Sequence, residues 1–188
     1  WNVSADNWLT AGEAGPDQLT PDLTSLLQAI IDQDGWVAGQ SAVFTIYGTG
    51  CKVAESYDGS PDQAPQLIIE YFSAATAKLR VSAPEDDLEE FIAGATQTKP
   101  VGSLDAGSSD LELGTEAGNG NDPQLIGLRF QNLDIAAGTP IQSAFLQFTV
   151  DELKNAGAAT MIIKAQADPL PASFDATTAF NISSRPTF

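Results

Sequence analysis

The chain has 188 residues, of which 43% are hydrophobic, so it can bury a sizeable core and is not expected to be disordered. Acidic residues outnumber basic ones by 25 to 8, which gives a formal net charge of −17 at pH 7. Such a surface repels nucleic acid and anionic membranes, because both are bound by clustered Lys and Arg. Neither is expected as a partner, whereas calcium is attracted by clustered carboxylate and carbonyl oxygens.

Histidine is absent, and Cys51 is the only cysteine. The lack of histidine excludes Ser-His-Asp and Cys-His mechanisms and removes the commonest ligand of zinc. One cysteine can form no disulfide within the chain, and without a nearby histidine it is expected to be unreactive. The sequence has no signal peptide and no apolar run long enough to span a bilayer, so membrane insertion is not expected. It begins at Trp1 as an internal piece of a larger protein would.

One short amphipathic helix is predicted over residues 20–33. Thr20 is the expected capping residue, Pro21 occupies the first helical position, and Asp22 places an acid in the first turn. Apolar residues then follow at spacings of three and four and form one stripe, which consists of Leu23, Leu26, Leu27, Ile30 and Ile31. Gly35 is expected to end the helix, and its stripe needs a sheet to pack against.

The remaining pattern predicts β-strands separated by turn-forming residues. The expected strands span residues 41–47, 66–72, 111–113, 125–130, 141–150 and 159–167. Strands at such intervals, with Gly, Pro, Asn and Asp between them, predict an all-β jelly-roll β-sandwich. Two further stretches are interpreted as a linker (73–80) and as a long exposed loop (114–123).

Several segments of the second half resemble the opening of a known family. They are Asp86-Asp87-Leu88-Glu89-Glu90, SSDLELG (108–114), GLRF (127–130) and AAGTPIQSAFLQFTVDE (136–152). Together they resemble the DNRLRE-type jelly-roll domains of bacterial surface proteins, which include alginate-binding carbohydrate modules. In that family an acidic strand leads to an Arg-Phe strand and then to a Gly-x-x-Ile-x-x-Ala segment, which Gly138, Ile141 and Ala144 match.

The first half is similar to the closing part of the same family. Its matching segments are Trp1 and Trp8, TPDLTSLLQAII (20–31), GWVAGQSAVFTIYGTG (35–50), ESYDG (55–59) and APQLIIEY (64–71). The resemblance covers most of the chain and implies a jelly-roll fold, without implying one activity.

The two halves stand in the opposite order to that family. Residues 1–72 correspond to the C-terminal half of a module, 73–80 to a linker, and 81–188 to the N-terminal half. Joined end to end, NISSRPTF and WNVSADNW would form one continuous stretch of an ordinary module. Either copies of the chain complete one another in a tandem array or filament, or the chain is a circular permutant that closes on itself.

An acidic cluster is the strongest candidate for a metal site. The expected calcium ligands are Asp86, Asp87, Glu89, Asp110 and Glu112. Asp110 and Glu112 should share one face of a strand, because side chains alternate with period two. The alternative interpretation is a solvated acidic face. Asp151, Glu152 and Asp58 are secondary candidates, and Asp58-Gly59 is first of all a turn signal.

Sugar binding would require exposed aromatic rings. The aromatic candidates are Trp1, Trp8, Trp36, Tyr47, Tyr57 and Tyr71, although such residues more often pack in a core. Trp8 lies in a polar, loop-like context, so it is the ring most expected to be exposed, with Tyr57 as its companion.

These observations predict a non-catalytic, extracellular structural module of a bacterial cell surface. It would be a repeat or subunit of a surface fibre, adhesin stalk or filament, with copies of itself as partners and calcium as a rigidifying ion. The alternative is a carbohydrate-binding module, calcium-dependent or not, whose partner is a polysaccharide. A glycosidase would need a marked pair of carboxylates, and chance pairs abound among 25 acids. No enzymatic activity is therefore expected.

Overall fold

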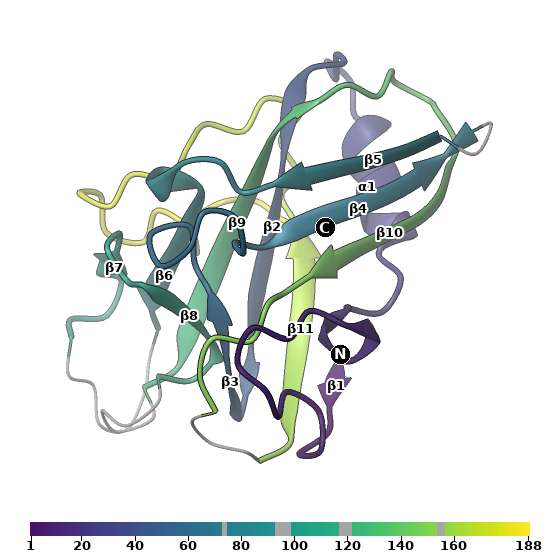
Figure 1. The fold of residues 1–188 in the computed structure, drawn as a ribbon. Helices are drawn as coiled ribbons and strands as arrows, with labels where there is room; N and C mark the ends of the chain where they lie inside the picture. Colours follow the sequence, from purple (N-terminus) through teal and green to yellow (C-terminus); the bar gives the residue numbers. More distant parts are fainter. Residues whose placement is uncertain (73–74, 93–98, 117–121, 154–156) are drawn as a thin grey trace.

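Two layers of antiparallel strands face each other in the computed structural model (Figure 1), which describes residues 1–72, 75–92, 99–116, 122–153 and 157–188. The first layer is a six-stranded sheet with the spatial order β1 (Asn2–Val3), β11 (Ala159–Ala165), β2 (Gln40–Thr49), β9 (Gln124–Leu133), β6 (Asp87–Phe91) and β7 (Leu104–Asp105). The second layer holds two sheets, β10 (Ile141–Gln147) with β4 (Gln66–Tyr71) and β5 (Ala75–Arg80), and β3 (Cys51–Glu55) with β8 (Asp110–Gly114). The predicted all-β sandwich is confirmed.

The chain beyond β10 links the two smaller sheets. Val150 forms an antiparallel bridge with Ala54 of β3, and the N–H of Asp151 donates to the carbonyl of Val53 at 3.1 Å. The segment from Ile141 to Asp151 therefore pairs first with β4 and then with β3, and we call this whole segment the extended β10. This pairing explains why the sequence predicted a strand as far as residue 150.

The other edge of β10 is covered by residues 12–22. The N–H of Thr20 donates to the carbonyl of Leu146 at 3.0 Å, and the N–H of Phe148 donates to the carbonyl of Gln18 at 3.1 Å. Covering a sheet edge in this way satisfies its backbone groups and prevents pairing with another chain.

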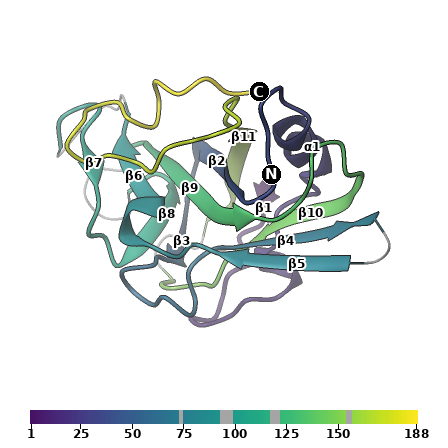
Figure 2. The same ribbon diagram turned by 90° about the horizontal axis from the view of Figure 1, so that it is seen from above.

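The helix α1 (Thr24–Ile31) packs against β10 and β11 and closes one side of the sandwich (Figure 2). Its start differs from the prediction, because Thr20 does not cap it. The hydroxyl of Thr20 instead accepts a hydrogen bond from the N–H of Leu146 at 3.0 Å. The N-cap position is Leu23, which has no capping side chain, and the Oδ1 of Asp22 just before it accepts from the N–H of Thr24 at 2.9 Å. Thr20, which was predicted to cap the helix, therefore forms its hydrogen bond with the covered edge of β10.

The main core lies between the two layers. Inward side chains of β2, β9, β4, the extended β10 and α1 meet there, and the largest fully buried ones include Phe44, Phe130, Phe148, Leu67 and Leu27. Alternation along each strand places Phe44, Phe130 and Leu67 on the strand faces that meet there.

The segment predicted as a linker contains a strand. Residues 75–80 form β5, which pairs with β4 from Tyr71↔Ala75 to Gln66↔Arg80. The linker prediction is wrong for these residues. Their small side chains give little sign of a strand, but their backbone groups pair with β4 and complete a hairpin. Residues 73 and 74 lie outside the described part of the chain.

Each of the three sheets combines strands from residues 1–72 with strands from residues 81–188. The pairs that do so are β1 with β11, β2 with β11 and β9, β10 with β4, and β3 with β8. The two halves that the sequence distinguishes therefore complete each other's sheets within one chain.

The outer face of the six-stranded sheet is covered by residues 168–188. Gly127 of β9 permits this contact, because a Cβ there would lie 2.6 Å from the ring of Phe174 and 3.0 Å from Ile182. Arg185 holds the segment together through all five of its N–H groups. They donate to the carbonyls of Asn181, Ala172 and Ser173 and to the side chains of Gln166 and Asn181, at 2.8–3.1 Å.

Candidate functional site

The five predicted calcium ligands do not form one site. Asp86 is fully buried, and its carboxylate pairs with Nη1 of Arg129 at 2.8 Å while also accepting from the amide of Gln131. The Arg129 guanidinium neutralises this charge, so Asp86 is a structural ion-pair partner. Its assignment as a calcium ligand is wrong.

Asp87 occupies a separate, buried position. Its side chain is buried, and its Oδ2 accepts the N–H of Tyr57 at 2.7 Å. Its Oδ1 has no hydrogen-bond partner among the described residues. Burial, reinforced by the charges of Asp58 and Asp86, raises the pKa of this carboxyl to about 7.

The raised pKa of Asp87 predicts a pH-dependent stability. The unfolded chain releases this proton near pH 3.8, whereas the folded protein holds it up to about pH 7. Between these values the folded state binds more protons, so rising pH lowers the free energy of unfolding by up to about 1.4 kcal/mol per pH unit. Above about pH 7 this contribution becomes constant. Asp87→Asn should flatten that decline, as measured by urea unfolding across the pH range.

Asp62→Asn is the matched control, since Asp62 is exposed. The difference between the two variants separates Asp87 from Glu89 and Glu55, whose pKa values are also raised by burial. An equal pH slope in both variants would contradict the assignment.

Glu89 and Glu112 form a buried pair between β6 and β8. The N–H of Glu112 donates to Oε1 of Glu89 at 2.8 Å. Burial raises the pKa of Glu89 well above its usual value, and the charges of Glu112, Asp110 and Asp105 raise it further. Lys99 pairs with Asp105 at 2.5 Å at the rim of this group.

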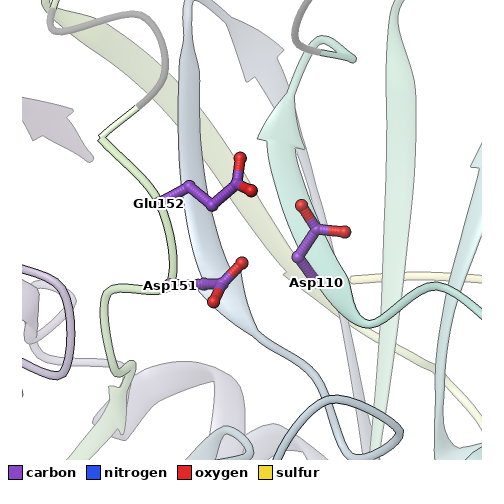
Figure 3. A group of neighbouring side chains, drawn as sticks. All are labelled: Asp110, Asp151 and Glu152. Atoms are coloured by element: carbon purple, nitrogen blue, oxygen red, sulfur yellow. The ribbon is translucent and has the colours of Figure 1, made fainter.

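Three carboxylates converge at a different place, where β8 begins and the extended β10 ends (Figure 3). Oxygen atoms of Asp110, Asp151 and Glu152 lie within 4.8 Å of one another. Glu55 lies opposite Asp110 in the β3–β8 ladder. Burial raises the pKa of Glu55, and so do the charge of Asp151 and the hydrogen bond between the two side chains. We call Glu55, Asp110, Asp151 and Glu152 the acidic cluster.

The pairing of three segments creates this cluster. β3 and β8 bring Glu55 beside Asp110, and the bridge between Ala54 and Val150 brings residues 151 and 152 to the same point. Asp110 and, as secondary candidates, Asp151 and Glu152 were predicted from the sequence. Glu55 was missed, because its position beside Asp110 depends on a pairing between distant strands.

The acidic cluster has the donor chemistry of a calcium site. Calcium takes six to eight oxygen ligands, and carboxylates bind it through one or both oxygens. Crowded carboxylates repel one another, and a divalent cation would remove this repulsion.

Trp8 is not an exposed ring. Its side chain is only 5% exposed, and its indole N–H donates to the carbonyl of Asp17 at 3.2 Å. It packs with Trp1 and Phe148, at ring-centroid distances of 6.3 and 6.1 Å. The predicted sugar platform is therefore wrong for Trp8. Tyr57 is half-buried and packs against the main core.

A cavity of about 230 Å³ lies on the outer face of the six-stranded sheet, under the C-terminal segment. Its polar lining consists of Thr45, Tyr47, Lys164, Ser183, Arg185 and Thr187, and its apolar lining of Ile92, Leu125 and Ile182. We call it the outer-face pocket. Tyr47 was one of the aromatic candidates, whereas Lys164 was missed, because its approach to residues 182–187 depends on the fold.

Comparisons with models of protein families, with curated proteins and with solved structures found no match. The resemblance to DNRLRE-type domains therefore stays a prediction. No helix among the described residues is long and apolar enough to cross a membrane.

Proposed function

We propose that this chain is a non-catalytic structural module of an extracellular assembly on a bacterial surface, in which copies of the chain complete one another. It would act as a repeat or subunit of a fibre, adhesin stalk or filament. The support comes from one feature, the arrangement of two short segments along β11.

These two segments lie on the same edge of β11 and run in the same direction. Trp1 exchanges two backbone hydrogen bonds with Met161, both 2.7 Å long, and β1 continues this pairing. Farther along the edge, the N–H of Phe188 donates to the carbonyl of Ala165 at 2.9 Å. Both segments are antiparallel to β11. Figure 1 shows the two marked chain ends beside this strand.

The register leaves a short interval between the segments. Because Phe188 lies opposite Ala165 and Trp1 opposite Met161, only the positions opposite residues 162–164 separate them. Three extended residues would join the segments into one strand. If the two segments belonged to successive copies, residues 1–72 of one copy would complete the sheets of residues 75–188 of another.

A tandem protein tests this exchange. Two copies joined by three β-prone residues between Phe188 and Trp1 should exchange their halves, because so short a connector cannot reach from one finished module to the next. Chains exchanging in this way should form concentration-dependent oligomers or filaments in light scattering and electron microscopy. The matched control carries a flexible linker of about 20 residues and should give two independent modules.

A three-residue tandem that remains monomeric, with the same stability per module as the single copy, would contradict the proposal. In that case the chain would be a self-closed permutant.

We also propose that calcium binds the acidic cluster and rigidifies the module. Calcium sites of extracellular modules have dissociation constants of about 10⁻⁴–10⁻³ M. About 10 mM calcium should then raise the free energy of unfolding by roughly 1.4–2.7 kcal/mol, because it binds only the folded state. Chemical unfolding with and without calcium measures this change.

Asp151→Asn should abolish most of the calcium effect, whereas Asp62→Asn, at an exposed position outside the cluster, should retain it. A calcium effect equal in both variants, or equal to that of magnesium, would contradict binding at this cluster.

A further inference from the structure

The outer-face pocket combines positive charge with an apolar floor in a strongly acidic chain. Lys164 and Arg185 are two of only eight basic residues, and both line this cavity. Neither forms an ion pair within the described part of the chain. Asp168 interacts electrostatically with Arg185 but does not line the cavity, and two cations in one cavity lining favour an anionic ligand.

The two cations have different roles. Arg185 uses all its N–H groups on the C-terminal segment and stacks on the ring of Phe174 at 4.4 Å. It can therefore contribute charge but no further hydrogen bond. Lys164 makes no hydrogen bond to the described residues, and its ammonium lies 5.7 Å from the ring centroid of Tyr47. Lys164 is thus the group that can donate to a ligand.

The strand register explains why these side chains meet. Lys164 of β11 lies opposite Thr45 of β2, and Ile162 lies opposite Tyr47, which lies in turn opposite Leu125 of β9. These residues share the outer face, and residues 182–187 form the opposite wall.

One buried acid lies behind that wall. The Oε2 of Glu90 accepts the N–H groups of Ile182 and Ser183 at 2.8 and 2.9 Å. These two bonds fix the backbone of the wall.

We propose that the outer-face pocket binds a small organic carboxylate of about one ring. The cavity holds the volume of roughly seven or eight water molecules, since each occupies about 30 Å³ in the liquid. Lys164 would bind the carboxylate, and the hydroxyls of Thr45 and Thr187 would offer hydrogen bonds. Leu125 and Tyr47 would contact the ring. A single donating cation suits a monoanion better than a phosphate dianion.

NMR titration of the ¹⁵N-labelled protein tests this proposal with benzoate as the probe. Benzoate should produce saturable shifts at the amides of residues 45–47, 164 and 182–187. Benzamide, which has the ring without the charge, and acetate, which has the charge without the ring, should each bind at least tenfold more weakly. Inorganic phosphate should also bind more weakly than benzoate.

The variants separate a site from general charge attraction. Lys164→Gln should weaken benzoate binding at least tenfold, and Lys164→Arg should restore much of it. Lys78→Gln, on the exposed side of β5 in the other layer, should change nothing. Unfolding curves and amide spectra of the free variants check that each is folded.

Equal binding of benzamide and benzoate would overturn the proposal, as would undiminished binding by a folded Lys164→Gln variant. Shifts confined to other surfaces would do the same. None of these results bears on the tandem exchange, which depends on the edge of β11.

Discussion

Replacing Trp8 with alanine is expected to lower the free energy of unfolding by about 3–5 kcal/mol. The indole is 95% removed from solvent, and its loss would leave a cavity beside Trp1 and Phe148. It would also leave the carbonyl of Asp17 without the indole N–H that donates to it. Urea or guanidinium unfolding, followed by far-UV circular dichroism, measures the change.

The control for this variant is its neighbour Leu9, which is 55% exposed. Leu9→Ala should change stability by less than about 0.5 kcal/mol. If Trp8→Ala changed the free energy of unfolding as little as Leu9→Ala, the ring would be exposed, as predicted from the sequence alone. The large expected loss also means that weaker glycan binding by Trp8→Ala would report unfolding rather than a removed contact.

Replacing Arg129 with methionine is expected to cost about 3–5 kcal/mol, because it leaves the buried carboxylate of Asp86 without its cation. The amide of Gln131 remains as a hydrogen-bond donor but carries no charge. Chemical unfolding of the variant and the unchanged protein under the same conditions measures the loss.

The double variant Arg129→Met with Asp86→Asn is the decisive comparison. It removes the cation and the anion together and should recover a large part of the stability that Arg129→Met loses. Lys78→Met removes a cation from an exposed position and should have little effect. If the double variant is no more stable than Arg129→Met, the charge of Asp86 is not the cause of the loss.

The elements that depend on local pattern were predictable from the sequence. The alternation at residues 41–47 and the apolar stripe from Leu23 to Ile31 correspond to β2 and α1. β5 was missed, because Ala75–Arg80 is short of the branched and aromatic residues that indicate a strand, and its pairing with β4 supplies the missing preference. The start of α1 was misplaced, because Thr20 and Asp22 both carry oxygens typical of caps, yet both accept backbone N–H groups of β10 and the helix begins only at Thr24.

The candidate sites divide in the same way. The sequence showed that acids abound, that histidine is absent and that cations are scarce, and from these facts calcium was predicted as a ligand. It could not show that Asp86 meets Arg129 while Asp110 meets Asp151 and Glu152. Nor could it show that Trp8 is buried, since its polar neighbours indicate a loop but not what the indole contacts.

By itself, the sequence of this protein determined the class of fold, the sign of its surface charge and the kinds of ligand that surface can attract. These properties follow from composition and from periodicity over a few residues. Only the tertiary structure decided which carboxylates gather, which one is neutralised by an arginine and that Lys164 faces a cavity. Such contacts join residues far apart in the chain. The register that brings them together is set by backbone pairing and core packing, which no short stretch of sequence determines.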